Sequence, residues 1–269
     1  MRTQIVTARQ NPLVKKIYAL KDKKKRDEAA LFVTEGRKPL EEGLQNGCVP
    51  VYLLVREDID ISDALIRRLD CVARNSCECV ILGDSAFKKI SSDKASEGIM
   101  CVWNFLSGRE EMLLQSIRKN PTGSYLILER VQDPGNIGTI LRSALAFGCD
   151  GVLLCDCADI YNPKTVRATM GNLFRVPFAK VDRIESCREL LPDGKLYAAM
   201  VSSGGITPEE LQKEDKAAVL IGNEGQGLSK QAVEICDGTV HIPIRNAESL
   251  NAAVAASVLL WEMSKGRAL

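Results

Sequence analysis

The C-terminal half of the chain alternates short apolar runs with helical patterns, and this alternation constrains the fold more than any other feature. Strands are predicted at residues 125–128, 151–154, 196–200, 218–221 and 239–242. Runs such as Gly151 to Leu154 are apolar at every position, which is typical of strands buried on both faces. The pattern therefore predicts an α/β fold with a parallel sheet covered by helices on both faces, and a last helix over 251–264.

The N-terminal half mixes the same patterns less regularly and predicts a second, smaller α/β domain. Apolar residues recur at helical spacing within 12–26. Short apolar strands are predicted at 31–33, 51–55, 79–82 and 99–103. A polar stretch ending at Asn120-Pro121 separates the halves, because the residue before a proline disfavours helix. We therefore expect domains at 1–105 and 122–269, joined by a linker over 106–121.

The net charge of +1 indicates no partner, but the charge is distributed unevenly. Residues 1–26 contain nine Lys and Arg side chains and a single acid, Asp22. A charge run of this kind commonly forms the solvated face of a helix, and it also suits a polyanion. Both interpretations stay open on charge alone.

The ten cysteines and the single histidine, His241, show no metal-binding pattern. Cys77 and Cys79, like Cys155 and Cys157, are separated by one residue, whereas zinc-binding pairs have gaps of about two to four. The first residues do not resemble a secretion signal, and no apolar stretch reaches membrane-spanning length. We therefore expect a cytoplasmic protein with reduced thiols, no metal and no membrane partner.

Three unusual segments follow predicted strands. They are the glycine-rich segment 222–228, the segment from Asn136 to Arg142, and Ser249-Leu250-Asn251 ahead of an alanine-rich helix. Because ligands of open parallel sheets bind beyond the carboxyl ends of the strands, we expect the three segments at one site. Taken singly, each has an ordinary explanation: a strand–helix turn, an internally paired arginine and a helix N-cap.

The glycine-rich segment does not match the common phosphate-binding loops. It lacks the Gly-Lys-Ser/Thr of a P-loop and the Gly-x-Gly-x-x-Gly of dinucleotide-binding enzymes. Glu224 lies within the segment and would repel a triphosphate. The pattern therefore argues against a nucleotide-binding oxidoreductase and favours a cationic or hydroxyl-bearing ligand.

Together, the three segments resemble the motifs of the SpoU family of RNA ribose 2′-O-methyltransferases. These motifs are Asn-x-Gly-x-x-x-Arg, Gly-Asn-Glu-x-x-Gly-Leu, and Ile-Pro-Met followed by Ser-Leu-Asn. The matching residues are Asn136, Gly138, Arg142, Gly222, Asn223, Glu224, Gly227, Leu228, Ile242, Pro243, Ser249, Leu250 and Asn251. Ile244 stands where the family has methionine. The resemblance covers essentially all of residues 122–269.

The resemblance implies a deep trefoil knot in the C-terminal domain, a homodimer and S-adenosylmethionine as the methyl donor. The residues expected to hold this cofactor are Gly222, Gly227, Ile242, Leu250 and Ser202. The residues expected to position the ribose or take part in catalysis are Asn136, Arg142, Glu224, Ser249 and Asn251. Because an arginine stays protonated, we expect Arg142 to clamp a phosphate and stabilise the developing alkoxide.

The N-terminal domain resembles the RNA substrate-binding domain often fused ahead of this catalytic domain, which is itself similar to a small ribosomal-protein fold. The likeness lies in Asn11-Pro12, 32–36 and 98–100. It implies that RNA, ribosomal more than transfer RNA, is contacted by Lys15, Lys23, Lys24 and Arg26. Two alternatives stay open: a knotted methyltransferase acting on transfer RNA or on a base, and an RNA-binding protein without activity.

Overall fold

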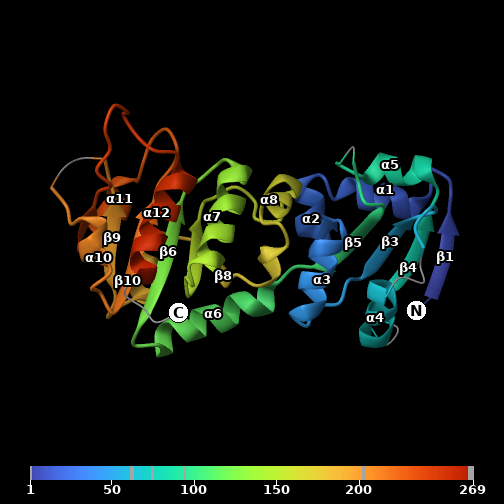
Figure 1. Cartoon of the computed structure of the whole chain (residues 1–269), viewed down its shortest axis with the longest axis horizontal. Coiled ribbons are helices and arrows are strands. Elements are labelled where there is room, and N and C mark those ends of the chain that lie inside the picture. Colours follow the sequence, from blue (N-terminus) through green and yellow to red (C-terminus); the bar gives the residue numbers. More distant parts are fainter. Residues whose placement is uncertain (1, 61–63, 74–75, 94, 202–203, 266–269) are drawn as a thin grey trace. The chain divides into compact units, whose positions relative to one another are not determined.

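The computed structural model of the chain describes residues 2–60, 64–73, 76–93, 95–201 and 204–265 (Figure 1). The chain divides into two compact units. The first comprises Met1–Phe105 and Tyr161–Arg175, and the second comprises Leu106–Ile160 and Val176–Leu269. The chain therefore leaves the second unit after Ile160 and returns to it at Val176, an excursion that the expected boundaries at 105 and 122 did not include.

The first unit is built on a mixed five-stranded sheet. In spatial order its strands are β1 (Arg2–Val6), β4 (Glu78–Leu82), β3 (Tyr52–Arg56), β5 (Ile99–Asn104) and β2 (Leu31–Glu35). β1, β4 and β3 run parallel, whereas β5 pairs antiparallel with both β3 and β2. The four strands predicted from the sequence are confirmed, and β1 was not predicted.

Helices cover both faces of this sheet. They are α1 (Pro12–Ala19), α2 (Lys23–Ala29), α3 (Arg37–Gln45), α4 (Ala64–Ala73), α5 (Asp84–Ile90) and the short α8 (Pro163–Ala168). The helix expected over 12–26 is divided, because Asp22 caps α2 by accepting a hydrogen bond from Lys25 N (3.2 Å). On α3, Gly43 lies so close to Trp103 that an added Cβ would meet the indole ring at 2.4 Å.

The segment 161–175 completes the core of the first unit. Its rings at Tyr161 and Phe174 pack against Phe32, with centroid distances of 4.9 and 5.9 Å. Phe174 also lies 4.6 Å from the ring of Trp103, whose Nε1 donates to Thr34 Oγ1 (2.9 Å). Aromatic contacts at these distances contribute beyond the area they bury. The segment thus belongs to the first unit by packing, although it is flanked in sequence by the second.

The second unit contains a six-stranded sheet in which every pair of neighbouring strands is parallel. In spatial order its strands are β11 (Gly238–Val240), β9 (Lys195–Ala199), β10 (Lys216–Ile221), β6 (Gly123–Glu129), β7 (Gly151–Cys155) and β8 (Phe178–Val181). The central strands β10 and β6 are buried at every residue, as the continuous apolar runs predicted. The parallel sheet is therefore confirmed.

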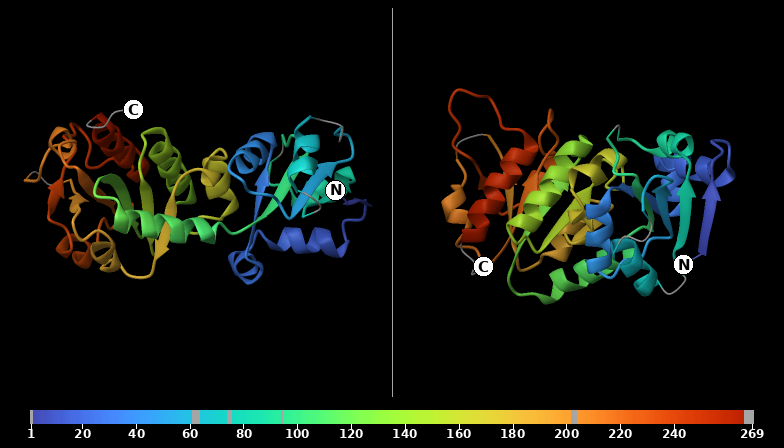
Figure 2. Two further views of the ribbon diagram at one scale, coloured as in Figure 1. Left: turned by 90° about the horizontal axis from the view of Figure 1, so that it is seen from below. Right: turned by 45° about the vertical axis from the view of Figure 1, so that its right-hand side comes forward.

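Helices lie on both faces of this sheet. Helices α7 (Pro134–Ala146) and α12 (Ala252–Lys265) lie side by side on one face (Figure 1), joined by a 2.8 Å hydrogen bond between the hydroxyls of Ser143 and Ser257. Helices α6 (Ser107–Lys119), α9 (Ser186–Leu190) and α11 (Lys230–Glu234) contribute to the core on the other face (Figure 2). Helix α10 (Pro208–Leu211) begins at Thr207, where the capping box predicted from the sequence is present.

The linker expected over 106–121 is not extended chain. Most of it forms helix α6, which buries Leu113 and Ile117 against the sheet of the second unit. The polar composition of this stretch reflects the solvated face of an amphipathic helix. None of the helices in the part of the chain that the structure describes is long and apolar enough to cross a bilayer.

Candidate active site

The three segments singled out in the sequence meet beyond the carboxyl ends of β6 and β10. Next to this meeting point, a cavity of about 360 Å³ opens at the carboxyl ends of β9, β10 and β11, at the lower end of the size range of small-molecule sites. Its walls are the glycine-rich loop 222–228 and the loop 241–251, and its floor is largely apolar. Four of the five residues expected to hold a cofactor line it: Gly222, Gly227, Ile242 and Leu250. The fifth, Ser202, lies outside the described residues.

Three side chains from the three segments form one hydrogen-bonded chain. Asn251 Nδ2 donates to Asn136 Oδ1 (3.0 Å), and Asn136 Nδ2 donates to Glu224 Oε1 (2.9 Å). Asn251 also caps α12, because its Oδ1 accepts hydrogen bonds from the backbone N–H groups of Ala253 (2.8 Å) and Val254 (3.3 Å). The cap predicted at the start of this helix is therefore present, and it fixes a side chain of the site.

The Glu224 carboxylate is held at the entrance of α7. In addition to Asn136, it accepts hydrogen bonds from the backbone N–H groups of Gln132 (3.2 Å) and Asp133 (3.1 Å). Partial burial opposes ionisation, but the hydrogen bonds outweigh it and lower the pKa of Glu224 below its ordinary value. Glu224 is thus a fixed anion that orients the glycine-rich loop.

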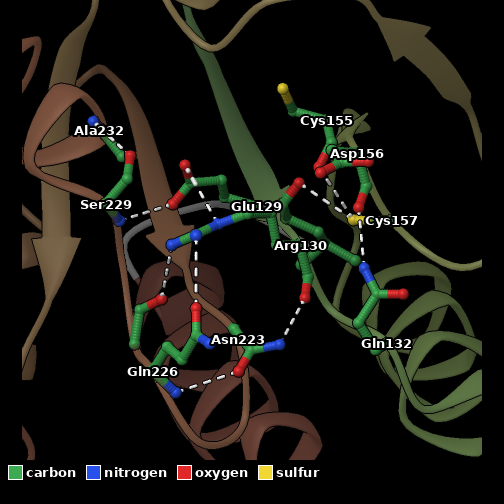
Figure 3. Close-up of polar contacts among 12 residues, drawn as sticks. Glu129, Arg130, Gln132, Cys155, Asp156, Cys157, Asn223, Gln226, Ser229 and Ala232 are labelled. Carbon is green, nitrogen blue, oxygen red and sulfur yellow. Dashed lines mark hydrogen bonds and ion pairs between the residues drawn. The ribbon is translucent and has the colours of Figure 1, made fainter.

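Glu129 and Arg130, at the end of β6, anchor the same loop (Figure 3). Asn223 Nδ2 donates to Arg130 O (2.9 Å), and the Arg130 guanidinium reaches Gln226 Oε1 and Gly227 O, both at 3.5 Å. The buried Glu129 carboxylate accepts from Ser229 N (2.8 Å), so the far end of the loop is also tied to the strand. Neither residue was predicted from the sequence, since Glu129-Arg130 belongs to none of the motifs described above.

The backbone of Arg130 adopts the left-handed conformation, with φ of 55°. This conformation costs a non-glycine residue roughly 1–2 kcal/mol. It lets Arg130 N donate to Cys155 O (2.9 Å) while Arg130 O faces Asn223. Gly222 is constrained by space instead: a Cβ there would meet the Gly227 carbonyl carbon at 2.4 Å. Only glycine permits this approach.

The opposite wall, the loop 241–251, has few internal ties. Among the residues that the structure describes, neither Ile242 N nor Leu250 N has a hydrogen-bond partner. Ser249 lines the cavity and is exposed. Backbone donors left without partners beside an apolar cavity are suited to the polar edge of a planar heterocycle.

Arg142 does not join the polar chain. It is exposed on α7, and among the described residues no hydrogen bond or ion pair to it is present. Six residues after Asn136, it lies about 120° around the helix axis from that side chain. Of the alternatives for Arg142, internal pairing is therefore not found among the described residues, and the side chain is presented to the surface.

The basic residues expected to bind RNA fall into two groups. Lys15 on α1 and Lys23 and Lys24 on α2 are exposed. The expectation for Arg26 is wrong: it is only 2% exposed, and its Nη1 donates to the backbone oxygens of Leu20 (2.8 Å) and Lys21 (2.9 Å). Arg26 instead joins α2 to the end of α1.

Comparison with known proteins matches both units. Residues 123–261 match the model of the SpoU rRNA methylase family, and residues 11–101 match the MRM3-like substrate-binding domain. The chain is 31% identical over 263 residues to the 23S rRNA (guanosine(2553)-2′-O)-methyltransferase RlmP of Bacillus subtilis. That alignment covers 97% of this chain and 98% of the relative.

Solved structures also match the chain over nearly its whole length. The S-adenosylmethionine-bound rRNA methyltransferase of Sinorhizobium meliloti matches with a TM-score of 0.85 and 28% identity, over 98% of both chains. The SpoU methyltransferase AviRb of Streptomyces viridochromogenes, in complex with S-adenosylmethionine, matches with a TM-score of 0.80 and 26% identity. That match covers 95% of this chain and 98% of AviRb.

Proposed function

The chain belongs to the SpoU family of rRNA methylases, and from this premise we propose that it transfers a methyl group from S-adenosylmethionine to a ribose 2′-hydroxyl of structured ribosomal RNA. The observation that carries the proposal is the convergence of Asn136, Glu224 and Asn251 beside the cavity, which Glu224 lines, at the carboxyl ends of β9, β10 and β11. The matched relatives that bind this cofactor or methylate 23S rRNA support it.

The cavity suits S-adenosylmethionine. Its apolar lining includes Met200, Ile221 and Leu259, which offer a surface for adenine, and the free amides of Ile242 and Leu250 can bind the polar edge of the base. Gly225 and Gly227 carry no side chain that would block the approach of a bulky ligand. When bound, the cofactor supplies an electrophilic methyl group on a sulfonium. The protein's main task is then to align the hydroxyl with that carbon.

Arg142 has the chemistry to complete the reaction. Its guanidinium stays protonated, so it cannot accept the proton of the hydroxyl. A permanent cation with planar donors binds an RNA phosphate and stabilises negative charge that develops on the 2′-oxygen. We assign Arg142 this role, with Asn136 and Glu224 fixing the loop that faces the ribose.

In a homodimer that pairs through α12, Arg142 of one copy would complete the site of the other. Val254 and Trp261, one heptad apart on α12, are about half exposed, and the ring of Trp261 lies 5.6 Å from that of Phe147 on α7. An exposed apolar stripe of this kind marks a protein interface. We propose that a second copy packed on this stripe brings the partner's Arg142 to the cavity, which Arg142 of the same chain does not line.

Mixed dimers test this arrangement. Arg142→Ala keeps the cavity, whereas Leu250→Arg fills it, so each variant alone is expected to be inactive. If the arginine acts across the dimer, random mixing of the two restores about a quarter of wild-type activity, because half the dimers carry one complete site. Absence of recovery in mixtures shown to exchange subunits would refute the shared site.

Three further properties are part of the proposal. We propose that the second unit contains the trefoil knot, on the basis of its likeness to the matched structures. The first unit binds RNA, as the substrate-binding domain match suggests. The protein works in the cytoplasm, where its ten free thiols remain reduced.

Methyl transfer to ribosomal RNA tests the activity. The purified chain is incubated with labelled S-adenosylmethionine and ribosomal RNA from cells lacking the gene, and the product is digested and analysed by mass. A methylated ribose that resists alkali is the expected product. A methylated base, transfer RNA as the only substrate, or cofactor binding without transfer would replace the proposal by one of the alternatives.

A further inference from the structure

Tyr18, at the end of α1, is an exposed aromatic side chain on a basic surface of the first unit. It is 47% exposed, although its neighbours Val14 and Ile17 are buried in the core. Helix α1 packs against α5, so Tyr18 borders the side chains of that helix. A tyrosine that is half exposed contributes little to the core, and its ring can contact a ligand.

Two lysines lie over this ring. Lys21 Nζ is 4.9 Å and Lys89 Nζ is 5.7 Å from the ring centroid. Both ammonium groups are steadied by backbone carbonyls: Lys21 donates to Ser91 O (3.3 Å) and Lys89 to Arg9 O (3.0 Å). Such cation–π contacts are worth about 0.5–1 kcal/mol at exposed sites and keep the cations beside the ring.

The positive charges of these two lysines are not neutralised by ion pairs in the described part of the chain. Among the residues that the structure describes, neither Lys21 nor Lys89 has a carboxylate within ion-pair distance. The adjacent Lys88, by contrast, is paired with Asp84 at 2.7 Å. Lys16 follows the same pattern as Lys21, with its Nζ 5.7 Å from the ring of Tyr52. The surface therefore combines an exposed aromatic face with unneutralised cations.

We propose that Tyr18, Lys21 and Lys89 form a binding site for an unpaired nucleotide of the RNA substrate, the Tyr18 site. The proposal rests on the proposed function and specifies how the first unit binds that RNA. An unpaired base takes the place of the two ammonium groups on the tyrosine ring, and these groups then contact its flanking phosphates. Duplex RNA hides its base faces, and an acidic peptide has no aromatic face to stack, so single-stranded RNA fits both features.

Binding of a labelled oligonucleotide to the full chain tests the Tyr18 site. The probes are a fluorescein-labelled oligouridylate and a labelled blunt-ended RNA duplex without unpaired nucleotides, measured by fluorescence anisotropy without cofactor. Tyr18→Ala is expected to weaken oligouridylate binding about ten-fold, within the range for loss of one stacked base, and to leave duplex binding within about two-fold. Tyr18→Phe keeps the ring and is expected to bind like the wild type.

The lysines are tested by the salt dependence of binding. Lys89→Ala is expected to weaken the binding of both probes and to reduce the slope of log affinity against log salt by about 0.7 for the single strand. Lys88→Ala is the matched control, because it removes the same charge from a lysine that is paired with Asp84 and lies outside the Tyr18 site, and it is expected to change both values less than Lys89→Ala does. Thermal unfolding of each variant confirms that the fold is retained.

Three outcomes overturn the Tyr18 site. Tyr18→Ala could bind oligouridylate as the wild type does, or it could lose affinity for duplex and single strand equally. Polyglutamate could also displace the oligonucleotide equally well from wild type and Tyr18→Ala, which would indicate an acidic partner. Failure of the proposed function is distinct from these: the wild type would then transfer no methyl group to ribosomal RNA, whatever the Tyr18 variants bind.

Discussion

The two loops that line the cofactor cavity are held very differently. The glycine-rich loop 222–228 is tied to β6 and α7 by hydrogen bonds through Asn223, Glu224 and Arg130. Among the described residues, the loop 241–251 is tied at its two ends only, by a hydrogen bond from His241 N to Ile206 O (3.2 Å) and by the contacts of Asn251, where α12 begins. The glycine-rich loop is therefore ordered before a ligand binds, whereas the loop 241–251 has backbone amides that are free to bind one.

The difference separates positioning from binding. Groups that are already paired, such as the Glu224 carboxylate, lose little freedom when the site is used, because the fold has ordered them. Groups without partners among the described residues, such as the amides of Ile242 and Leu250 and the Arg142 guanidinium, are those that we expect to contact cofactor or RNA. Changing a residue of each class is expected to produce different defects.

Removing Arg142, the unpartnered cation, is expected to have the largest effect on the reaction. Arg142→Ala should lower turnover by about 10²–10³, the usual loss when one group that stabilises an oxyanion is removed. The dissociation constant for S-adenosylmethionine, measured by calorimetry, should stay within about two-fold, because Arg142 does not line the cavity. Lost cofactor binding in this variant would contradict the assignment.

Glu224 belongs to the fixed wall, so its loss is expected to act mainly on the pocket. Glu224→Gln presents an amide N–H₂ to backbone donors that now face a carboxylate oxygen. Cofactor affinity is expected to fall about ten-fold, and the free energy of unfolding by about 1 kcal/mol, a value reduced for the exposure of this side chain. Calorimetry and urea unfolding measure the two effects.

The effect of Glu224 on stability also depends on pH. Its folded pKa is lowered, so its contribution is fully present above the ordinary glutamate pKa of about 4.3. The contribution is lost as the pH falls through the lower, folded pKa. The difference in unfolding free energy between wild type and Glu224→Gln is therefore expected to be constant near pH 7 and to shrink below about pH 4. A difference that grew on acidification would show that other groups dominate.

Arg130 offers a smaller test of the same wall. Arg130→Ala should weaken cofactor binding only about three-fold, because its two contacts to the loop are long, at 3.5 Å. Arg130→Gly removes the same contacts and also relieves the left-handed backbone, so it should be more stable than the alanine variant by about 1 kcal/mol. Equal stability of the two variants would show that the backbone conformation carries no strain.

The smallest expected effect is on hydrogen exchange in the loop 241–251. Amide hydrogen exchange in the loop 241–251 is expected to slow when S-adenosylmethionine binds, because Ile242 N and Leu250 N gain an acceptor. Exchange in the loop 222–228 is expected to change less, since its ties exist beforehand. The reverse result would show that the glycine-rich loop, and not its neighbour, responds to the cofactor.

Much of the site was predictable because parallel strands impose it. The expected strands place the segments containing Asn136 and Glu224 at one sheet edge, and Asn251 caps its helix as its residue type predicts. The anchoring by Glu129 and Arg130 was not predictable, because it depends on a left-handed residue that local sequence does not indicate. Charge alone also misassigned Arg26, whose partners are carbonyls of the preceding turn.

The excursion of the chain at 161–175 has a practical consequence. A truncated protein that began at Leu106 would contain every residue of the cofactor cavity, yet it would also carry Tyr161 and Phe174 without the aromatic partners that surround them. Such stranded rings favour aggregation. Separating the two units cleanly therefore requires a second edit, a short polar bridge in place of this segment, and not a single cut near residue 105.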